Sequence, residues 1–353
     1  MMIKEAIAKL VERRDLTRKE AQDAMQEIME GKATDAQIAA FLTALRMKGE
    51  TIEEITSLAR VMRSRCSQIH PEVAGNLVDT CGTGGDQVKT FNISTVSAFV
   101  IAGAGIPVAK HGNRSVTSRC GSADLLETLG LRLNVPTETV EKAIEEVGIG
   151  FMFAPTFHPA MKYAVNPRGQ IGIRTVFNIL GPLTNPANVT AQLLGVYQES
   201  LTEPLASVLS NLGVKQAMVV HGLDGLDEVS TVGATKISWL REDEICSFTL
   251  EPEDFGIEKA KPEALRCSTT HESAVTTLRI IKGHCTHRDP KRAIVLLNAA
   301  AGIVVGGKAE SFEEGLELAA QSIESGAAYG KLVSLIEFTD GNLLRLEELE
   351  ITA

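Results

Sequence analysis

Residues 77–86 read LVDTCGTGGD, a short apolar run that ends in a glycine-rich turn. The same pattern returns where residues 106–109 lead into KHGNRS and where residues 218–220 lead into HGLDGLDE. Helical stretches follow these turns, and such alternation is typical of a mostly parallel central sheet flanked by helices. The sequence therefore predicts an α/β domain over residues 71–353. Ligands of such folds bind where strands end, so the glycine-rich turns are the first candidates for a site.

Residues 1–70 have a different pattern, in which apolar residues recur at steps of three and four, as on one face of a helix. Gly31 and Gly49 stand where helices are expected to end. The sequence predicts a small all-helical domain of four helices, three of which begin at a capping box. The capping pairs are Thr17 with Glu20, Thr34 with Gln37, and Thr51 with Glu54.

The overall composition argues against several classes of protein. The formal net charge is −10, which gives no general electrostatic reason to bind nucleic acid or an anionic membrane. No apolar run approaches the roughly 18 residues of a membrane span, and charged residues interrupt residues 1–16, where a signal peptide is continuously apolar. The 6 cysteines lie far apart without CxxC spacing, as in reduced cytosolic proteins. We therefore expect a cytoplasmic protein without nucleic-acid or membrane partners.

The turn at residues 79–86 contains Gly82, Gly84 and Gly85, followed by Asp86. Glycine lets the backbone turn tightly and aim several N–H groups at an anion. The spacing fits neither the dinucleotide motif GxGxxG nor the nucleotide motif GxxxxGKS/T. A glycine cluster alone is equally compatible with an ordinary tight turn, so the neighbouring motifs decide.

Two polar segments follow this turn. Residues 89–95, KTFNIST, put Ser94 and Thr95 at a helix start, where hydroxyls either cap the helix or meet phosphate or metal. Residues 110–119, KHGNRSVTSR, supply cations, hydroxyls and an amide that suit a phosphorylated sugar, although a solvated loop can share this composition. Their place between apolar elements and beside the glycine turn favours a ligand site.

The acidic pair Asp227 and Glu228 follows the predicted strand at residues 218–220. Adjacent carboxylates repel each other unless a cation lies near them, so this pair is a candidate for Mg²⁺, although acidic loops are often only solvated. His284, Cys285 and His287 suggest zinc at first sight, but no second ligand pair stands at the usual spacing.

Two further stretches carry weaker signals. Between residues 151 and 187, His158 and Arg168 are the polar side chains expected to reach a pocket, whereas Arg174 is expected to form a structural ion pair. Residues 241–270 are charged and weakly patterned, and they are expected to form surface elements beside the sheet.

Five motifs in this order resemble the anthranilate phosphoribosyltransferase family of tryptophan biosynthesis: GTGGD, NxST, KHGNRSVTSRCGSAD, GIRTVFNILGPLTNPA and DGLDE. The similarity covers nearly the whole chain, including the helical N-terminus. It implies transfer of the phosphoribosyl group of phosphoribosyl diphosphate (PRPP) to the amine of anthranilate, with release of pyrophosphate and a need for Mg²⁺. It also implies a helical domain joined by helices around residues 160–180, and a homodimer formed through the helical parts.

The resemblance assigns a role to each motif. Residues implied to bind PRPP are Gly82, Gly84, Gly85, Asp86, Thr90, Asn92, Ile93, Ser94, Thr95, Lys110, Asn113, Arg114, Ser115, Ser118 and Ser122. Residues implied to bind anthranilate are Gly82, His111, Asn113, His158 and Arg168. Residues implied to contact the metal are Ser94, Asp227 and Glu228. No residue is implied to act as a discrete catalytic acid or base.

Two alternatives share this fold. A pyrimidine nucleoside phosphorylase also has a lysine- and serine-rich phosphate loop, but the complete KHGNRS and DGLDE motifs argue against it. A non-catalytic, nucleic-acid-binding paralogue is expected to lack the metal carboxylates and to carry a basic surface, and this sequence has neither feature.

Overall fold

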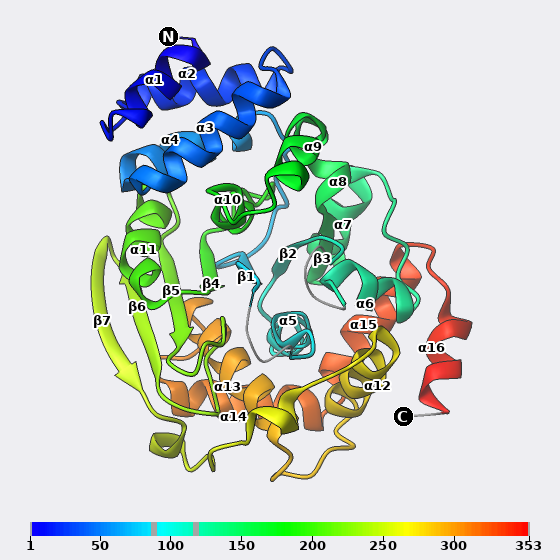
Figure 1. Ribbon diagram of the computed structural model, residues 1–353. Coiled ribbons are helices and arrows are strands. Elements are labelled where there is room, and N and C mark those ends of the chain that lie inside the picture. The colour runs from blue at the N-terminus through cyan, green and yellow to red at the C-terminus, as the bar shows by residue number, and fades with distance from the viewer. Residues whose placement is uncertain (1, 86–89, 116–119, 352–353) are drawn as a thin grey trace.

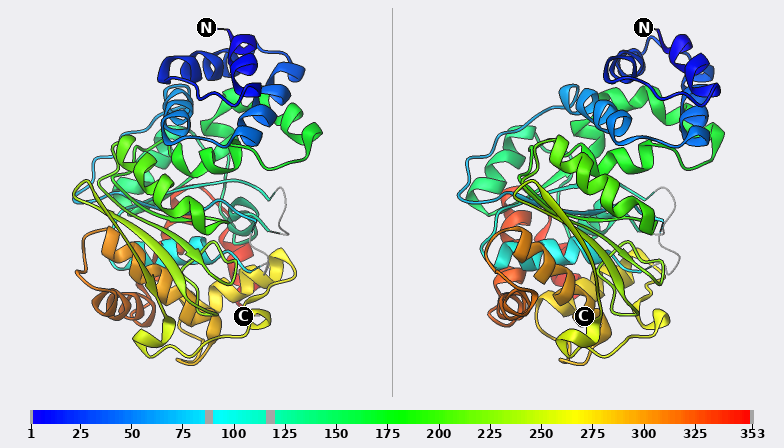
Figure 2. Two further views of the ribbon diagram at one scale, coloured as in Figure 1. Left: turned by 60° about the vertical axis from the view of Figure 1, so that its left-hand side comes forward. Right: turned by 90° about the vertical axis from the view of Figure 1, so that its left-hand side faces the viewer.

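The computed structural model describes residues 2–85, 90–115 and 120–351, so the predicted site residues Asp86 and Ser118 lie outside the described ranges. A layer of helices from the N-terminus covers one end of an α/β body (Figure 1). Seen from two other sides, the same helices stand above the sheet, and the C-terminal helices lie below it (Figure 2). This arrangement is the predicted fold class, a small helical part and a larger α/β part.

The α/β body is built on one seven-stranded sheet of order β3-β2-β1-β4-β5-β6-β7. The strands β3, β2, β1, β4 and β5 are parallel, and β6 and β7 are antiparallel. The strands are β1 (Val78–Gly82), β2 (Val108–Gly112), β3 (Ile149–Phe153), β4 (Ala191–Gly195), β5 (Gln216–Gly222), β6 (Thr235–Arg241) and β7 (Glu244–Leu250).

Helices connect these strands and cover both faces of the sheet (Figure 1). Those of the N-terminal layer are α1 (Ile3–Val11), α2 (Arg18–Met29), α3 (Asp35–Lys48) and α4 (Ile52–Ser64). Those that follow β1 to β4 are α5 (Ile93–Gly103), α6 (Ser122–Thr128), α7 (Thr137–Glu146), α8 (Ala154–Phe157), α9 (Lys162–Ile171), α10 (Phe177–Leu183) and α11 (Thr202–Asn211). Those after β7 are α12 (Thr270–Ile281), α13 (Pro290–Val305), α14 (Phe312–Glu324), α15 (Ala327–Phe338) and α16 (Leu343–Glu350).

The four N-terminal helices form as the sequence predicts. The side chain of each predicted threonine cap accepts a hydrogen bond from the backbone N–H three residues on. The Glu or Gln side chain at that position accepts a hydrogen bond from the backbone N–H of the threonine. Gly49 ends α3 with a φ of 92°, which favours glycine. The layer shares one hydrophobic cluster with side chains of α9, α10 and α11, and Asn166 of α9 donates to Asp35 of α3. The domain boundary at residue 70 stays a prediction.

Three strands extend further than their apolar residues predict. Strand β1 continues through Asp79 to Gly82, β2 continues through Lys110 to Gly112, and β5 continues to Gly222. The cause is backbone pairing, because Cys81 and Gly82 keep their partners on β4. A ladder of backbone hydrogen bonds does not depend on side-chain polarity, provided that buried polar side chains find partners.

The prediction for residues 241–270 was wrong in its first part. Arg241 ends β6, and residues 244–250 form β7, so this segment completes the sheet instead of lying beside it. Glu242 and Asp243 make the turn with φ values of 52° and 66°, a left-handed conformation usually taken by Asn and Gly. Most of the β7 side chains are exposed or half-buried, so an edge strand like this one carries no clear apolar pattern.

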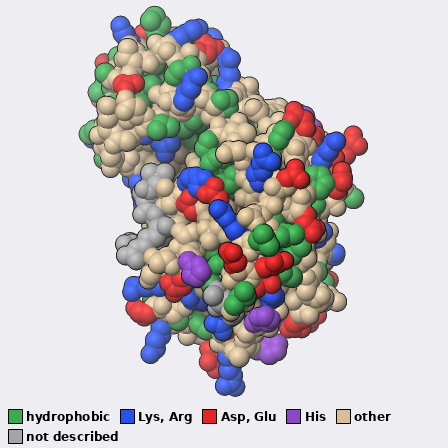
Figure 3. Space-filling view, turned by 90° about the vertical axis from the view of Figure 1, so that its right-hand side faces the viewer, with side chains coloured by type: hydrophobic (Ala, Val, Ile, Leu, Met, Phe, Trp, Pro, Cys, Tyr) green, Lys and Arg blue, Asp and Glu red, His purple; other side chains and the backbone are tan. Residues whose placement is uncertain are grey.

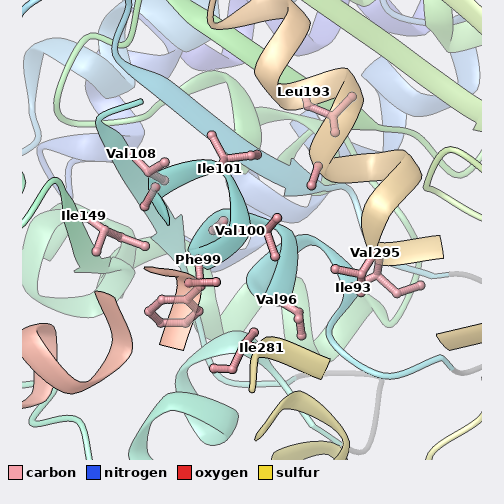
Figure 4. Close-up of a cluster of buried hydrophobic side chains, with 14 of the residues drawn as sticks. Ile93, Val96, Phe99, Val100, Ile101, Val108, Ile149, Leu193, Ile281 and Val295 are labelled. Carbon is pink, nitrogen blue, oxygen red and sulfur yellow. The ribbon is translucent and has the colours of Figure 1, made fainter. Parts of the chain in front are cut away.

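Helix α5 is fixed on all sides by close packing. Its side chains Val96, Phe99 and Ile101 are buried between the sheet and the helices that carry Ile281 and Val295 (Figure 4). A Cβ added to Gly302 of α13 would lie 2.2 Å from Ile101, so glycine allows α13 to approach α5 closely. The first turn of α5 therefore has little freedom to move.

None of the helices in the described ranges combines the length and apolar character that crossing a membrane requires. On the face that Figure 3 shows, lysine and arginine side chains are interspersed with aspartate and glutamate.

Replacing Glu54 by Ala is expected to lower the free energy of unfolding by about 3 kcal/mol. The Glu54 side chain is fully buried, pairs with Lys48 Nζ at 2.8 Å, and accepts the Leu16 backbone N–H at 2.9 Å. Glu53→Ala is the matched control, because Glu53 is exposed and 3.9 Å from Arg18, and its loss is expected to cost less than about 1 kcal/mol. Urea unfolding followed by circular dichroism measures both, and equal losses would contradict the assigned role of the buried pair.

Candidate active site

Three motifs that are far apart in the sequence meet at the carboxyl ends of neighbouring parallel strands. The Gly84 backbone N–H donates to Asp227 Oδ2 at 2.8 Å, which ties the glycine turn after β1 to the acidic loop after β5. Lys110 of β2 donates to Ser94 Oγ at 3.4 Å, which brings the start of α5 to the same place. This edge of a parallel sheet is where ligands of such folds bind.

The glycines of the turn are required by the close approach of the acidic loop. A Cβ on Gly82 would lie 2.5 Å from Asp227 Oδ2, and one on Gly195 of β4 would lie 1.6 Å from the Asp227 backbone oxygen. Gly84 and Gly85 have φ values of 69° and 90°, which favour glycine. Glycine at these positions lets the acidic side chain enter the concave side of the turn.

A buried cation lies beneath the turn. The Lys110 ammonium donates to the Thr80 backbone oxygen at 2.5 Å, and only 3% of the residue is exposed. Burial lowers the pKa of Lys110, while the carboxylates of Asp79 and Glu228 act in the opposite direction. These two carboxylates and the carbonyl acceptor stabilise the charged form of Lys110 against the effect of burial. In its charged form, Lys110 places a cation beneath the glycine turn, which suits an anionic ligand.

Asp79 is a site-supporting residue that the sequence did not single out. Its fully buried carboxylate accepts hydrogen bonds from the Asn185 amide at 2.8 Å and from the His111 backbone N–H at 3.3 Å. Burial raises the pKa of Asp79, and Lys110 counteracts this rise. Asn185 also donates to the Ala109 carbonyl at 2.9 Å. A polar pair inside an otherwise apolar strand was the only sequence signal for this network.

The KHGNRS segment is shaped by the helix that follows it. Arg114 forms ion pairs with Asp124 at 3.0 Å and Glu127 at 2.8 Å, so its charge is balanced by carboxylates of α6. The second Asp124 oxygen accepts the Ser115 backbone N–H at 3.0 Å. Ser122 donates to the Asn113 carbonyl at 3.3 Å. The sequence missed the roles of Asp124 and Glu127, although GSAD signals a helix start.

The segment at the start of α5 mixes supporting and unpartnered groups. Asn92 donates to the Cys120 carbonyl at 3.1 Å and accepts from Ser273 at 3.0 Å, so its amide joins two segments. The Thr95 hydroxyl is buried without a hydrogen-bond partner among the described residues. Two further predicted residues lie beside these: Ile93 in the core and Thr90 paired with Arg266 in an isolated bridge.

A cavity of about 470 Å³ opens beside the glycine turn. It lies between the carboxyl ends of β1 and β2 and the segment that runs from α8 to α10, and α4 contributes Met62. All five residues predicted to bind the acceptor line it: Gly82, His111, Asn113, His158 and Arg168. The volume suits a small aromatic molecule.

Arg168 supplies a positive charge inside the cavity. Its guanidinium lies over the Phe177 ring, 5.1 Å from the ring centre, and burial lowers its pKa. Within the described ranges no acidic side chain forms an ion pair with it, in contrast to Arg114. A half-buried guanidinium of this kind is a receptor for a planar carboxylate, which it can bind through two parallel hydrogen bonds.

His111 and His158 form the polar wall of the cavity, with ring centres 5.0 Å apart. Burial lowers the pKa of His158 to about 4, and burial together with His158 holds the pKa of His111 well below its ordinary value. Both rings are therefore neutral at pH 7. The Nε2 atoms of both are buried without a partner in the described part of the chain, so both remain available to a ligand.

The stability of the protein is expected to fall between pH 6.5 and pH 4 in part because of His158. A folded-state pKa of about 4, below the ordinary value of 6.5, means that protonation favours the unfolded chain, so the stabilisation is complete above pH 6.5 and is lost as the pH falls. At pH 5 the loss from this residue is about 2 kcal/mol. Urea unfolding of wild type and His158→Gln at pH 7.5 and pH 5 measures it, and identical pH dependence in the two proteins would contradict it.

Arg174 forms no ion pair within the described ranges. Its guanidinium donates a hydrogen bond to the Gly85 carbonyl at 3.1 Å and lies over the Tyr197 ring, 4.5 Å from the ring centre. A Cβ on Gly85 would lie 2.0 Å from its terminal nitrogen. Arg174 thus connects the segment after α9 to the glycine turn, which spacing alone does not reveal.

The acidic loop has the donor chemistry that Mg²⁺ takes. Asp227 and Glu228 provide carboxylate oxygens, and Ser94 provides a hydroxyl held beside Lys110. Among the described residues no three His, Cys, Asp or Glu side chains converge as a metal cage. Mg²⁺ ordinarily uses one or two carboxylates together with substrate phosphates, so the residues fit that ion. Asp224 has another task, since it accepts the Ser230 hydroxyl at 2.5 Å and the Leu226 N–H at 3.1 Å.

Known protein families and individual relatives match nearly the whole chain. Residues 4–66 match the helical bundle domain of a glycosyl transferase family, and residues 74–329 match the α/β domain of that family. An anthranilate phosphoribosyltransferase of Acetivibrio thermocellus is 53% identical over 339 residues, covering 96% of this chain and 97% of the relative. One from Pelotomaculum thermopropionicum is 54% identical over 345 residues, covering 97% and 98%.

Solved structures agree with these relatives. The crystal structure of anthranilate phosphoribosyltransferase from Thermus thermophilus has a TM-score of 0.90 at 40% identity and covers 95% of this chain and 99% of that one. The Saccharomyces cerevisiae enzyme in complex with PRPP and Mg has a TM-score of 0.88 at 29% identity, covering 96% and 98%. With relatives that are 53% and 54% identical over nearly its whole length, the chain belongs to the anthranilate phosphoribosyltransferase family.

Proposed function

We propose that this protein transfers the phosphoribosyl group of PRPP to the amine of anthranilate and releases pyrophosphate, the second step of tryptophan synthesis from chorismate. The observation that carries the proposal is the guanidinium of Arg168, which lines a small cavity that also reaches Gly82 of the glycine turn. A carboxylate acceptor carries the charge that such a cation complements, whereas a pyrimidine nucleoside is neutral, which favours this activity over that of a nucleoside phosphorylase.

The donor diphosphate is expected to occupy the glycine turn. Its binding groups are the Lys110 ammonium, the hydroxyl of Ser94 and the backbone N–H groups of Gly84 and Gly85, of which the Gly84 N–H donates to Asp227 until the ligand displaces that carboxylate. Asn113, Ser115 and Ser122 extend the same surface toward the sugar phosphate. Asp227, Glu228 and Ser94 would hold Mg²⁺, which would supply positive charge where negative charge develops on the leaving pyrophosphate. Fixed N–H dipoles in a shielded site add to this effect.

The acceptor is expected to bind in the cavity with its carboxylate on Arg168 and its ring against His111 and His158. The amine of anthranilate is neutral at pH 7, so the reaction requires no strong general base. Neutral His111 and His158 can donate or accept hydrogen bonds without introducing a charge. Much of the remaining rate enhancement comes from holding the amine and the anomeric carbon in line.

The reaction is tested by the loss of anthranilate fluorescence when PRPP and Mg²⁺ are added, with a magnesium-free sample as the control. Magnesium-dependent loss at nanomolar enzyme supports donor, acceptor and cofactor together. No loss, with PRPP binding still seen by calorimetry, would retain the donor site and exclude anthranilate as the acceptor.

The same proposal includes a cytoplasmic homodimer that contacts through the helical layer. It is supported by the exposed apolar side chains Val11 and Met47, which are 67% and 74% exposed at the ends of the contacting helices α1 and α3. Sedimentation of wild type and Met47→Glu tests the dimer. Identical sedimentation of the two proteins as monomers would remove this part of the proposal.

A further inference from the structure

Helix α13 contains a buried amide that contacts the acidic loop directly. Asn298 is fully buried in a helix whose neighbouring side chains are almost all apolar. Its Oδ1 accepts the Val229 backbone N–H at 2.9 Å, and its Nδ2 donates to the Val229 carbonyl at 2.8 Å. Nδ2 also donates to the Ile294 carbonyl at 2.8 Å. Val229 directly follows Glu228, so both backbone groups of the residue next to the acidic pair are bound by one side chain.

A buried amide at this position destabilises the fold unless it serves a specific purpose. Burying an amide without partners costs about 1–3 kcal/mol, and an aliphatic residue of similar size avoids that cost. Asn298 uses both of its N–H groups and its oxygen, so it is a fully satisfied buried polar group. A leucine here would fill the space but would leave the Val229 N–H and carbonyl without partners.

The acidic pair lies between two fixed points of the backbone. On the sheet side, Gly195 of β4 brings its backbone so close to the Asp227 carbonyl that a Cβ would lie 1.6 Å from it. On the other side, Asn298 fixes Val229. Beyond it, Ser230 donates its backbone N–H to Thr235 Oγ1 at 2.8 Å and its hydroxyl to Asp224 at 2.5 Å. The direction of the peptide that carries Glu228 is therefore set by Gly195 and Asn298 together.

We propose that Asn298 is a positioning residue for magnesium binding, which fixes Asp227 and Glu228 so that their carboxylates face the glycine turn. This rests on the proposed function, because it takes these carboxylates as the magnesium ligands. Asn298 itself touches neither metal nor substrate. Residues that orient metal ligands typically change metal affinity about 10- to 100-fold when they are removed.

The test is a calorimetric titration of the protein with pyrophosphate at a series of Mg²⁺ concentrations, which measures binding and not turnover. Asn298→Ala is expected to raise the apparent dissociation constant for Mg²⁺ at least about tenfold. Asn298→Asp keeps the acceptor for the Val229 N–H but sets a carboxylate oxygen against the Val229 and Ile294 carbonyl oxygens, so an increase at least as large is expected. Binding of anthranilate is expected to stay within a factor of about two in both variants, because Arg168 is supported by a different segment.

Ser322→Ala is the matched control. Ser322 is also buried and donates to the Val100 carbonyl at 2.7 Å, which ties α14 to α5 and not to the acidic loop. The Ser322→Ala substitution is expected to lower Tm without changing the apparent dissociation constant for Mg²⁺. If Asn298→Ala behaves like Ser322→Ala, or if neither Asn298 variant folds at 15 °C, Asn298 supports only the fold and the proposal is overturned. If wild type itself binds no magnesium pyrophosphate, the proposed function fails instead.

Discussion

Replacing Asp227 by Asn and Glu228 by Gln together is expected to lower magnesium-dependent turnover by about 10³-fold or more. The loop after β5 brings Asp227 to the glycine turn, where it accepts the Gly84 N–H, and the adjacent Glu228 acts electrostatically on Lys110. Without them, Mg²⁺ would keep only the Ser94 hydroxyl as a protein ligand, and the negative charge that develops on pyrophosphate would be left to the backbone N–H groups and Lys110. Folding is expected to persist, because both substitutions keep the size of the side chain.

The measurement is the initial rate over a magnesium series at saturating PRPP and anthranilate. Asp224→Asn is the matched control, since it neutralises a charge in the same loop at a residue that is occupied with Ser230 and Leu226. The control is expected to keep its dependence on Mg²⁺. Wild-type turnover in the double variant would remove the metal role from this loop.

Removing the charge of Asp227 is expected to strengthen the binding of pyrophosphate in the absence of metal, which is the opposite of its expected effect on magnesium pyrophosphate. Asp227 Oδ2 accepts the Gly84 N–H and lies 2.5 Å from where a Cβ of Gly82 would stand, so a carboxylate already occupies an N–H group of the turn. A metal-free anion must displace this carboxylate and is repelled by it. Asp227→Asn is therefore expected to bind metal-free pyrophosphate more tightly than wild type in calorimetry, although it binds magnesium pyrophosphate more weakly. Weaker binding in both conditions would show that Asp227 does not compete for the turn.

The sequence predicted those parts of the fold that depend on local signals. The three capping boxes of the helical layer depend on residues three positions apart, and all three form. The fold class follows from the alternation of strands and helices. The hairpin of β6 and β7 was missed, because its turn residues Glu242 and Asp243 are atypical and one face of β7 is exposed. An edge strand depends on its neighbour for pairing, and the neighbour is not visible in the local sequence.

The site was predictable where residue type alone carries the chemistry. The backbone freedom of glycine, the repulsion between adjacent carboxylates and the charge of a lone arginine do not depend on tertiary contacts. The partners of Arg114 and Arg174 were not predictable, because Glu127 lies on the next helix and Tyr197 lies beyond β4. The roles of Asp79 and Asn298 depend equally on tertiary contacts, with Asn185 and Val229. A buried polar side chain is recognised from its partners, and sequence spacing gives these only within one helix or turn.

Replacing Arg168 by Ala is expected to raise KM for anthranilate roughly 10²-fold while KM for PRPP changes little. The guanidinium lies over Phe177 in the acceptor cavity and forms no ion pair with the described acidic residues, so a bound carboxylate is its natural partner. Arg168→Lys keeps the charge but loses the planar fork, and an intermediate increase is expected. Lys162→Ala is the control, because Lys162 also lines the cavity but sits over the Tyr163 ring.

Initial rates with each substrate varied in turn separate the two KM values. Loss of a carboxylate contact formed in both ground and transition states raises KM more than it lowers kcat, whereas loss of a group that acts only in the transition state lowers kcat. Anthranilate methyl ester provides an independent check, because it lacks the carboxylate charge. Wild type should discriminate strongly between acid and ester, and Arg168→Ala should not. If the variant instead loses PRPP affinity and retains the preference for the acid, Arg168 belongs to the donor site, and the carboxylate must be bound elsewhere in the cavity.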